Sequence, residues 1–387
     1  MDLIARGHRA TFLHHPDAAA LVEPVDAGFE AIGASEPPVA GWTQPMAKIR
    51  GLSGLGGTFG GMVRFTDMIC REGPDALRRI GADAVLADQM EAGGALVADR
   101  LGLPFASIAV TLPINRELGV PPPYVGWDYQ AGDKGRKRNA GGWRVTDLLL
   151  RGVGKAIARN AAMLGLPERH RLEDCLSPIL QVTQLVAGLD FHRRELPAHF
   201  HYAGPFRAAG APEPFALPEG DERPLVYCSL GTLQGSRAGL FRKVAAACAA
   251  LDLRLLITTG GRSTLRSEEL PGRPIVRDWV PQEAVLTEAD MVVCHAGMNS
   301  VLDPLALGLP MVLMPLAFEQ GAVAARAAHT GVAKVLSPRA SVKALAGAIA
   351  EARSESRYRA RAGVLQAEIA ASGGAATAAD LIETALL

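Results

Sequence analysis

The fold is decided by residues 291–300, Met-Val-Val-Cys-His-Ala-Gly-Met-Asn-Ser, in which four apolar residues run directly into a polar, glycine-containing turn. The apolar part does not alternate with polar residues, which is typical of a parallel strand covered on both faces. Similar short apolar segments occur at 84–87, 105–110, 225–230, 255–259 and 311–314. Between them, apolar residues recur at helical spacing over 65–80, 91–101, 237–251 and 341–353. Because a parallel strand needs a long crossover connection, this alternation predicts an α/β fold with parallel sheets.

The chain divides into two halves. It has 387 residues, enough for two or three domains of ~150 residues each. Residues 206–223 are rich in proline and show no periodicity, so we expect an interdomain linker there. We therefore predict Rossmann-like domains over 1–205 and 224–373, and a terminal helix over 374–387 that crosses back to the first domain. Ligands of open α/β sheets bind at the carboxyl ends of strands, so two facing sheets would enclose a substrate cleft.

The composition excludes several classes of protein. Forty basic and forty acidic residues cancel, so no net charge attracts nucleic acid. Five cysteines without a CxxC pair favour a reducing compartment. The longest apolar stretch, 307–318, contains a glycine and two prolines and is shorter than the ~20 residues of a membrane-spanning helix. The first residues show no secretory signal. We therefore expect a cytoplasmic protein that binds no nucleic acid.

Two segments are predicted to be loops. Residues 51–61, Gly-Leu-Ser-Gly-Leu-Gly-Gly-Thr-Phe-Gly-Gly, match neither GxGxxG nor GxxxxGK[ST] and follow no strand, so they do not indicate a nicotinamide cofactor or a P-loop. We expect a flexible loop there. Residues 120–142 carry three consecutive prolines and then many charges, before a helical pattern that starts at Trp143. This second loop is expected to hang over the cleft of the first domain.

Polar residues gather where strands of the second half end or helices begin. These candidates are Ser229, Gly231, Thr232, Trp279, Val280, Gln282, His295, Gly297, Asn299, Ser300, Asp303, Glu319 and Gln320. Free N–H groups at a helix start bind phosphate, an imidazole suits a diphosphate, and carboxylates and amides suit sugar hydroxyls. A single histidine is more often structural, but four such segments on one sheet edge favour a site for a nucleotide sugar.

The same segments resemble a known family. Residues 279–282 (Trp-Val-Pro-Gln), 295–303 (His-x-Gly-x-Asn-Ser-x-x-Asp) and 319–320 (Glu-Gln) are similar to the donor signature of family-1 UDP-sugar-dependent glycosyltransferases of the GT-B fold. Over most of the chain, segments such as 65–72, 88–97, 112–117 and 229–235 are similar to bacterial zeaxanthin glucosyltransferases. The resemblance implies two facing Rossmann-like domains and an inverting transfer of glucose from UDP-glucose to a lipophilic hydroxyl, that of the carotenoid zeaxanthin. It implies neither a metal nor another cofactor.

The resemblance also assigns roles in the donor half. Trp279, Gln282 and Asp303 would contact the uracil and the ribose. The diphosphate would be held by His295, Asn299, Ser300 and Thr232. Glu319 and Gln320 would contact the glucose hydroxyls. Many family members have aspartate before the glutamine, so Glu319 is a departure that leaves the identity of the sugar open.

The first half should supply a general base. The resemblance implies a histidine in the loop after the first strand, oriented by an aspartate on a later strand, and Asp88 matches that aspartate. The alternative role for Asp88 is to cap the helix at 91–101. No histidine of the chain matches the base, because residues 5–12 are similar to the segment that ends the first helix in relatives. His8 would belong to the turn into the second strand, and His14 and His15 would leave that strand. We expect the first domain to lack its first strand, and hypothesise that the recorded start is an internal methionine.

The acceptor would lie under residues 120–142, with Asn115, Tyr124 and Trp127 as candidate contacts. The apolar residues of this loop would make peripheral contact with the membrane that holds the acceptor, or else pack on their own domain. Two other functions stay open. One is a glycosyltransferase for a macrolide, a polyketide or another lipophilic aglycone, and the other is a UDP-sugar-binding protein without catalysis. An epimerase of the GT-B type shares the architecture but not the signature.

Overall fold

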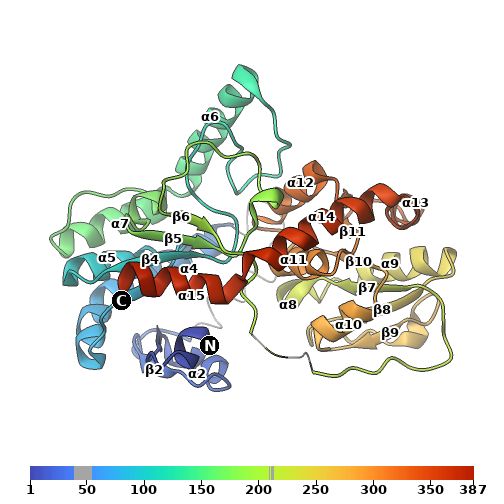
Figure 1. Cartoon of the computed structure of the whole chain (residues 1–387), viewed down its shortest axis with the longest axis horizontal. Helices are drawn as coiled ribbons and strands as arrows, with labels where there is room; N and C mark the ends of the chain where they lie inside the picture. The colour runs from blue at the N-terminus through green and yellow to red at the C-terminus, as the bar shows by residue number, and fades with distance from the viewer. Residues whose placement is uncertain (39–54, 209, 211–212) are drawn as a thin grey trace.

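The computed structural model describes residues 1–38, 55–208, 210 and 213–387, and its second half contains a six-stranded parallel sheet (Figure 1). The strands lie in the order β9 (Ile275–Arg277), β8 (Arg254–Thr258), β7 (Leu225–Ser229), β10 (Met291–Cys294), β11 (Met311–Leu313) and β12 (Ala333–Val335). From β7 the chain winds outward to β9, and it then returns to β10 and winds the other way. This reversal leaves a crevice at the carboxyl ends of β7 and β10, where open α/β sheets bind ligands.

Helices cover both faces of this sheet, which explains why its central strands are largely apolar. One face packs against α9 (Ala238–Ala250) and α13 (Val342–Ser354). The other packs against α10 (Gln282–Glu288), α11 (Met298–Ala306), α12 (Gln320–Thr330) and α14 (Ser356–Ser372). The short helices α8 (Gly231–Gln234) and η5 (Ser267–Glu269) complete this half. Every residue of β7 and β10 is buried.

The strands of the first half form two separate parallel sheets. One contains β3 (Val85–Asp88), β4 (Phe105–Ala109), β5 (Leu180–Thr183) and β6 (Phe200–Tyr202) in that order, and the other contains β1 (Thr11–His14) and β2 (Gly28–Ala31). Among the described strands, β1 pairs only with β2 and β3 only with β4. Phe12 on β1 is 49% exposed and Leu86 on β3 is 45% exposed. Within the part of the chain that the structure describes, each sheet therefore has an edge strand with no neighbour on its outer side.

Helices pack around both of these sheets. They are α1 (Asp2–Ala5), η1 (Pro16–Ala18), α2 (Ala19–Val22), α4 (Leu55–Ile80), α5 (Ala92–Leu101), α6 (Gly132–Leu149), α7 (Arg151–Met163), η3 (Leu172–Cys175) and η4 (Ala187–Leu189). The long helix α4 packs on α5 and α7, whereas α6 projects away from the rest of the first half (Figure 1). None of the described helices is long and apolar enough to cross a lipid bilayer. All five cysteines are buried and form no disulfide.

Both predicted loops turn out to contain helix. Residues 55–61 belong to α4, while the rest of that glycine-rich segment, 51–54, lies outside the described residues. Phe59, Met62 and Phe65 pack on the core of the first half, and this burial outweighs the low helix propensity of the glycines. In the other predicted loop, residues 120–142, helix α6 begins at Gly132, well before the expected start at Trp143. Its buried face is largely polar or glycine, so the hydrophobic pattern did not predict a helix there.

One of the hydrophobic clusters contains residues of both halves. Leu112, Leu185 and Leu189 of the first half pack in the same cluster as Leu302 and Leu305 of α11. A buried ion pair also joins the halves, because Arg326 Nε on α12 lies 2.6 Å from Asp190 Oδ1 after η4. The last helix, α15 (Gly374–Leu386), packs against β4 and β5 of the first half. These contacts fix how the two sheets face each other, and therefore the shape of the space between them.

Candidate active site

A cavity of about 790 Å³ lies at the point where the second sheet reverses its winding. All the donor-site candidates of the second half line this cavity: Ser229, Gly231, Thr232, Trp279, Val280, Gln282, His295, Gly297, Asn299, Ser300, Asp303, Glu319 and Gln320. The first half contributes Val110, Thr111 and Gln184. The structure thus brings together, from four separate segments, the polar side chains that the sequence placed on one sheet edge.

His295 is held between two glycines at the end of β10. A β-carbon on Gly231 would stand 2.8 Å from the ring, and one on Gly297 would stand 2.6 Å from Nε2, so neither position has room for a side chain. Ala296 adopts a left-handed φ of 64°, which few non-glycine residues do outside functional turns. Burial lowers the pKa of His295 to about 4, and Nδ1 has no protein partner. The imidazole is therefore neutral at pH 7 and has unused hydrogen-bonding capacity.

The helix that follows His295 begins in a way that suits an anion. Gly297 is the N-cap of α11 and supplies no side-chain acceptor, so the N–H groups of Met298, Asn299 and Ser300 have no partner within the helix. The helix dipole adds partial positive charge at the same end. A diphosphate placed there would accept hydrogen bonds from these amides without requiring a metal or a cationic side chain.

An exposed tryptophan forms a wall of the same cavity. The indole of Trp279 is 65% exposed, which is unusual for a side chain of this size unless a ligand covers it. The segment after β8 holds the tryptophan loop in place. Thr259 Oγ1 donates to Asp278 Oδ1 at 2.8 Å, and Gly260 N donates to the Asp278 carbonyl oxygen at 2.9 Å. A planar ring such as uracil could stack on this indole.

A chain of hydrogen bonds orients the carboxylate of Asp303. Tyr227 Oη donates to Gln282 Oε1 at 3.3 Å, which turns the amide of Gln282 so that its Nε2 donates to Asp303 Oδ2 at 2.6 Å. Arg207 Nε donates to Asp303 Oδ1 at 2.7 Å. The arginine also lines the cavity. Sequence analysis missed Arg207 because it lies in the proline-rich segment expected to be only a linker.

Glu319 and Gln320, at the start of α12, have different environments. Gln320 Oε1 accepts hydrogen bonds from the N–H groups of Leu316 and Ala317 at 2.8 and 2.9 Å, so the amide oxygen holds its own loop in place. Only the amide nitrogen remains for a ligand. Burial raises the pKa of Glu319, and the neighbouring Phe318 has a left-handed φ of 54°. The loop therefore presents Glu319 to the cavity at some conformational cost.

Gln184 joins the first half to this site. Its Nε2 donates to Asn299 Oδ1 at 3.0 Å and to the carbonyl oxygen of Val110, while its Oε1 accepts a 3.3 Å hydrogen bond from Arg207. No motif surrounds Gln184 in the sequence, and only the packing of the two halves brings it to the cavity. It orients Asn299 at the start of α11 and closes the cavity from the side of the first sheet.

The candidate acceptor residues lie elsewhere. Asn115 Nδ2 donates to Gln181 Oε1 at 2.7 Å, Tyr124 Oη contacts Met90 Sδ at 3.9 Å, and Trp127 lies 5.2 Å from the guanidinium of Arg138. None of the three lines the 790 Å³ cavity. In the same segment Val120 and the three prolines that follow it are buried. These four residues follow the alternative in which the loop packs on its own domain, whereas Tyr124 and Trp127 are only partly buried, and membrane contact through this loop stays a prediction.

Asp88 ends β3 at the edge of its sheet. Its Oδ1 accepts a 2.7 Å hydrogen bond from Met90 N, and burial raises the pKa of its carboxyl group. The N-cap of α5 is Glu91 rather than Asp88, since the Glu91 side chain accepts from Gly93 N at 2.9 Å. His8 packs against the C-terminal helix α15 rather than near Asp88, because its Nε2 lies 2.8 Å from Glu383 Oε1.

The fold and the cavity together define a class of protein. A GT-B glycosyltransferase has two parallel-sheet units and a last helix that returns from the second unit to the first. Its second unit has a ligand site at the start of a helix, where this chain places uncapped backbone amides in the same cavity as an exposed indole. The solved glycotransferase of kitacinnamycin has the same fold, with a TM-score of 0.78 over all of this chain and 94% of that one, at 24% identity.

Residues 209–366 match the family model described as UDP-glucoronosyl and UDP-glucosyl transferase. The zeaxanthin glucosyltransferase of Pantoea ananas is 38% identical over 99% of this chain and 90% of its own length. That of Pseudescherichia vulneris is 36% identical over all of this chain and 93% of its own. The chain belongs to the UDP-glucoronosyl and UDP-glucosyl transferase family, which confirms the resemblance drawn from the donor signature.

Proposed function

We propose that the protein transfers glucose from UDP-glucose to a hydroxyl group of zeaxanthin, with inversion at the anomeric carbon. The proposal is supported by the similarity to two zeaxanthin glucosyltransferases over nearly the whole chain. The observation that carries it is the buried, neutral His295 at the start of α11, facing the same cavity as Trp279 and Asp303. This arrangement suits a nucleoside diphosphate bound through its phosphates, its ribose and its base.

In the proposed complex each part of the donor has its own contacts. Uracil stacks on Trp279, and the ribose hydroxyls donate to the preoriented carboxylate of Asp303. The diphosphate is bound by His295, Asn299, Ser300 and Thr232 together with the backbone amides of α11. Glu319 and the free amide nitrogen of Gln320 contact the glucose hydroxyls, so the glutamate would read the sugar through a longer side chain than aspartate provides.

The proposed reaction is a single displacement. The acceptor oxygen forms a bond to the anomeric carbon as the bond from that carbon to the β-phosphate oxygen breaks, and UDP leaves. Negative charge grows on the diphosphate, where the imidazole and the α11 amides stabilise it without having to reorganise. The acceptor proton would pass to a general-base histidine that no histidine of this sequence matches, and Asp88 is proposed to orient that histidine. Such a base contributes about 10²–10⁴ in rate.

The acceptor is proposed to approach from the first half. Val110 and Thr111 form the wall of the cavity on this side. Asn115, Tyr124 and Trp127 lie in the segment that leads away from this wall, and we propose that they contact the length of the carotenoid. Because zeaxanthin dissolves in lipid, the proposal places the protein in the cytoplasm with peripheral contact to the membrane.

The test is incubation of the protein with UDP-[¹⁴C]glucose and either zeaxanthin or a macrolide aglycone, followed by lipid extraction. Label in a zeaxanthin glucoside, lost in Trp279→Ala and retained in Val364→Ser at a distant exposed site, would support the proposal. Label only in the macrolide product would favour the aglycone glycosyltransferase. UDP binding in a calorimeter without transfer to either acceptor would instead favour a UDP-sugar-binding protein.

A further inference from the structure

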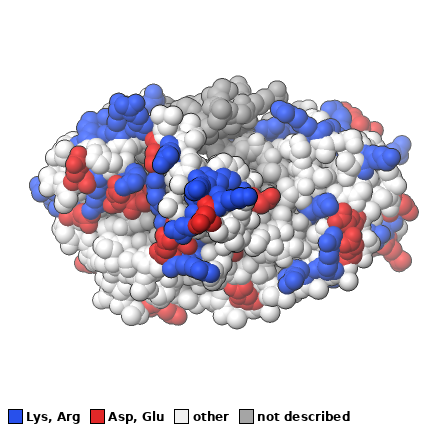
Figure 2. Space-filling model, turned by 90° about the horizontal axis from the view of Figure 1, so that it is seen from above, with Lys and Arg blue, Asp and Glu red and all other residues white. Residues whose placement is uncertain are grey.

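The projecting helix α6 and the start of α7 carry a strongly basic surface. We define the α6–α7 basic face by five exposed side chains, Lys134, Lys137, Arg144, Arg151 and Lys155. None of the five forms an ion pair with any residue that the structure describes. Figure 2 views the molecule from the side on which α6 projects, and Lys and Arg side chains gather over the projection in the middle of that view. The chain as a whole has no net charge, so this positive surface is a local feature.

Apolar side chains are exposed on the same helix. Leu148 is 68% exposed, Val145 57% and Leu149 42%. At 100° per residue, Leu148 lies within about 20° of Lys137 on the helix surface, opposite the buried side chains of Asn139 and Thr146. Basic and apolar side chains thus point outward together. A helix face of this composition is typical of segments that lie in the headgroup region of a bilayer.

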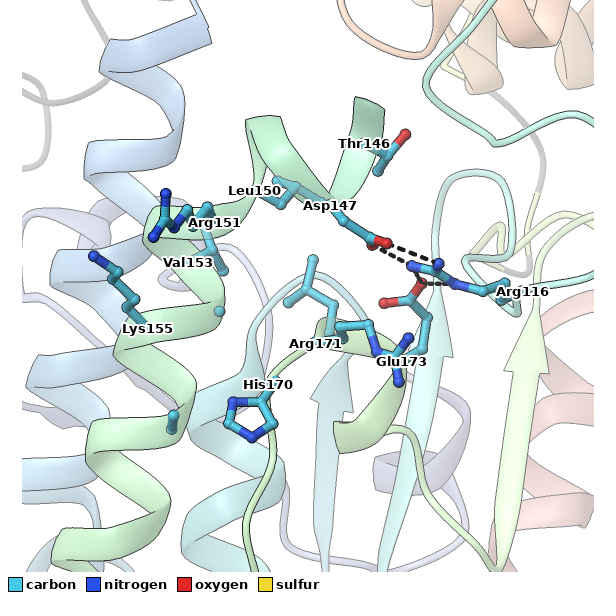
Figure 3. A pocket seen from close by; sticks show the side chains of 13 residues that line it. Arg116, Thr146, Asp147, Leu150, Arg151, Val153, Lys155, His170, Arg171 and Glu173 are labelled. Carbon is cyan, nitrogen blue, oxygen red and sulfur yellow. Dashed lines mark hydrogen bonds and ion pairs between the residues drawn. The ribbon is translucent and has the colours of Figure 1, made fainter. Parts of the chain in front are cut away.

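A second cavity, of about 530 Å³, opens where α6 meets α7 (Figure 3). Arg151 and Lys155 lie on one side of it and Arg171 on another (Figure 3). Its apolar lining includes Val153 and Leu172. Arg116 at its edge is already neutralised, since its guanidinium donates to Asp147 at 3.1 Å and to Glu173 at 3.2 Å. Arg151 and Lys155 have no such partner among the described residues. The cavity therefore offers unpaired positive charge beside apolar surface, which suits a lipid phosphate and the chain below it.

We infer that the α6–α7 basic face binds the surface of a bilayer that contains anionic phospholipid, with Val145 and Leu148 inserted at headgroup level. Charge attracts the protein to the surface, and the two apolar side chains explain why the partner is a lipid surface rather than a nucleic acid. The inference rests on the proposed function only for its biological reason, because a lipid-dissolved acceptor must be reached at the membrane. The sequence placed the expected membrane contact in the apolar residues of 120–142, and this inference places it on the exposed face of 134–155 instead.

Vesicle flotation tests this inference without donor or acceptor. The protein is mixed with vesicles of phosphatidylcholine alone or of phosphatidylcholine with phosphatidylglycerol, and the bound fraction is measured on a density gradient. The wild type should float only with the anionic vesicles and should be released by salt. Lys137→Glu/Arg144→Glu should weaken binding on the order of 100-fold. The matched double reversal Lys343→Glu/Arg353→Glu, at exposed positions on α13, should leave binding unchanged.

A second pair of variants isolates the apolar contribution. Val145→Ser should reduce the floated fraction at saturating anionic lipid, whereas Val364→Ser, at a similarly exposed valine on α14, should not. Equal flotation with neutral vesicles, unchanged binding after reversal of Lys137 and Arg144, or stronger retention by a DNA duplex than by anionic vesicles would overturn the inference. Flotation measures no sugar transfer, so the two proposals fail independently. Loss of vesicle binding with transfer to detergent-dispersed zeaxanthin intact would overturn only this inference. Vesicle binding without transfer would overturn only the proposed function.

Discussion

Replacement of Gly297 by alanine should displace the imidazole of His295 and slow the reaction of the donor. A β-carbon at residue 297 would stand 2.6 Å from His295 Nε2, whereas atoms in van der Waals contact lie roughly 3.5 Å apart. The ring must therefore move by about 1 Å. It cannot move freely, because Gly231 closes its other side so tightly that a β-carbon there would lie 2.8 Å away. The φ of Gly297 is −64°, which alanine also adopts, so the effect is steric rather than conformational.

The expected magnitude follows from that displacement. A misplacement of about 1 Å in a group that positions the reactants costs about 10²-fold in rate. This corresponds to about 2.7 kcal/mol of transition-state stabilisation. The folded structure should be little affected, because the new methyl group lies at a cavity wall rather than in the hydrophobic core.

The assay is kcat/KM for UDP-glucose consumption in the presence of acceptor, with the Kd of UDP measured by calorimetry and the fold checked by thermal unfolding. Gly239→Ala on α9 is the matched control, because no atom lies within 4 Å of the added β-carbon, and its kinetics should equal those of the wild type. A folded Gly297→Ala variant with wild-type kcat/KM would refute the assigned role of His295, since it would show that the position of the ring does not matter.

Three further predictions concern the binding of the uracil ring, the buried His295 and the ion pair between the two halves. Trp279→Ala should raise the Kd of UDP about 5- to 150-fold in calorimetry at unchanged Tm, because only a stacking surface is lost; unchanged affinity would contradict base stacking. The folded pKa of His295 is about 4, below its usual 6.5, so only the unfolded chain gains this proton as the pH falls through that window. Wild-type stability should therefore decline by roughly 3 kcal/mol more than that of His295→Gln between pH 6.5 and 4 in urea titrations, and parallel curves would argue against a buried neutral ring. Arg326→Met removes the nearer of the two counter-ions of buried Asp190, leaving Arg193 at 3.8 Å, and should cost up to about 3–5 kcal/mol in urea unfolding. Arg223→Met at an exposed pair should cost less than about 1 kcal/mol; equal losses would contradict a stabilising buried ion pair between the halves.

The second sheet was predictable because its strands are buried on both faces. The apolar segment 291–294 coincides with β10, and 225–230 extends only one residue beyond β7. The site was predictable for a related reason, since parallel strands bring their carboxyl ends to one edge whatever their separation in sequence. Residues such as His295 and Asp303 could thus be placed together before any tertiary contact was known.

What the sequence did not predict depends on contacts between distant segments. Gln184 and Arg207 enter the cavity only because the two halves share a core, and neither lies in a recognisable pattern. The start of α6 was missed because Asn139 and Thr146 are buried polar side chains, and Asn139 Nδ2 donates to the Leu118 carbonyl oxygen at 3.0 Å. Hydrophobic periodicity detects burial of apolar residues and is insensitive to a helix face that is buried through hydrogen bonds.

The core common to both halves has a consequence for engineering. In this chain the residues just before the proline-rich segment, Leu185 and Leu189 among them, pack with α11 of the second half. A chimera joined within 206–223 would pair these leucines with a foreign α11, leaving gaps or overlaps in a tightly packed interior. Exchange of donor specificity between relatives should therefore succeed more often when the crossover lies upstream of Gln184. The transplanted segment then includes both Leu185 and Leu189 and the α11 residues against which they pack.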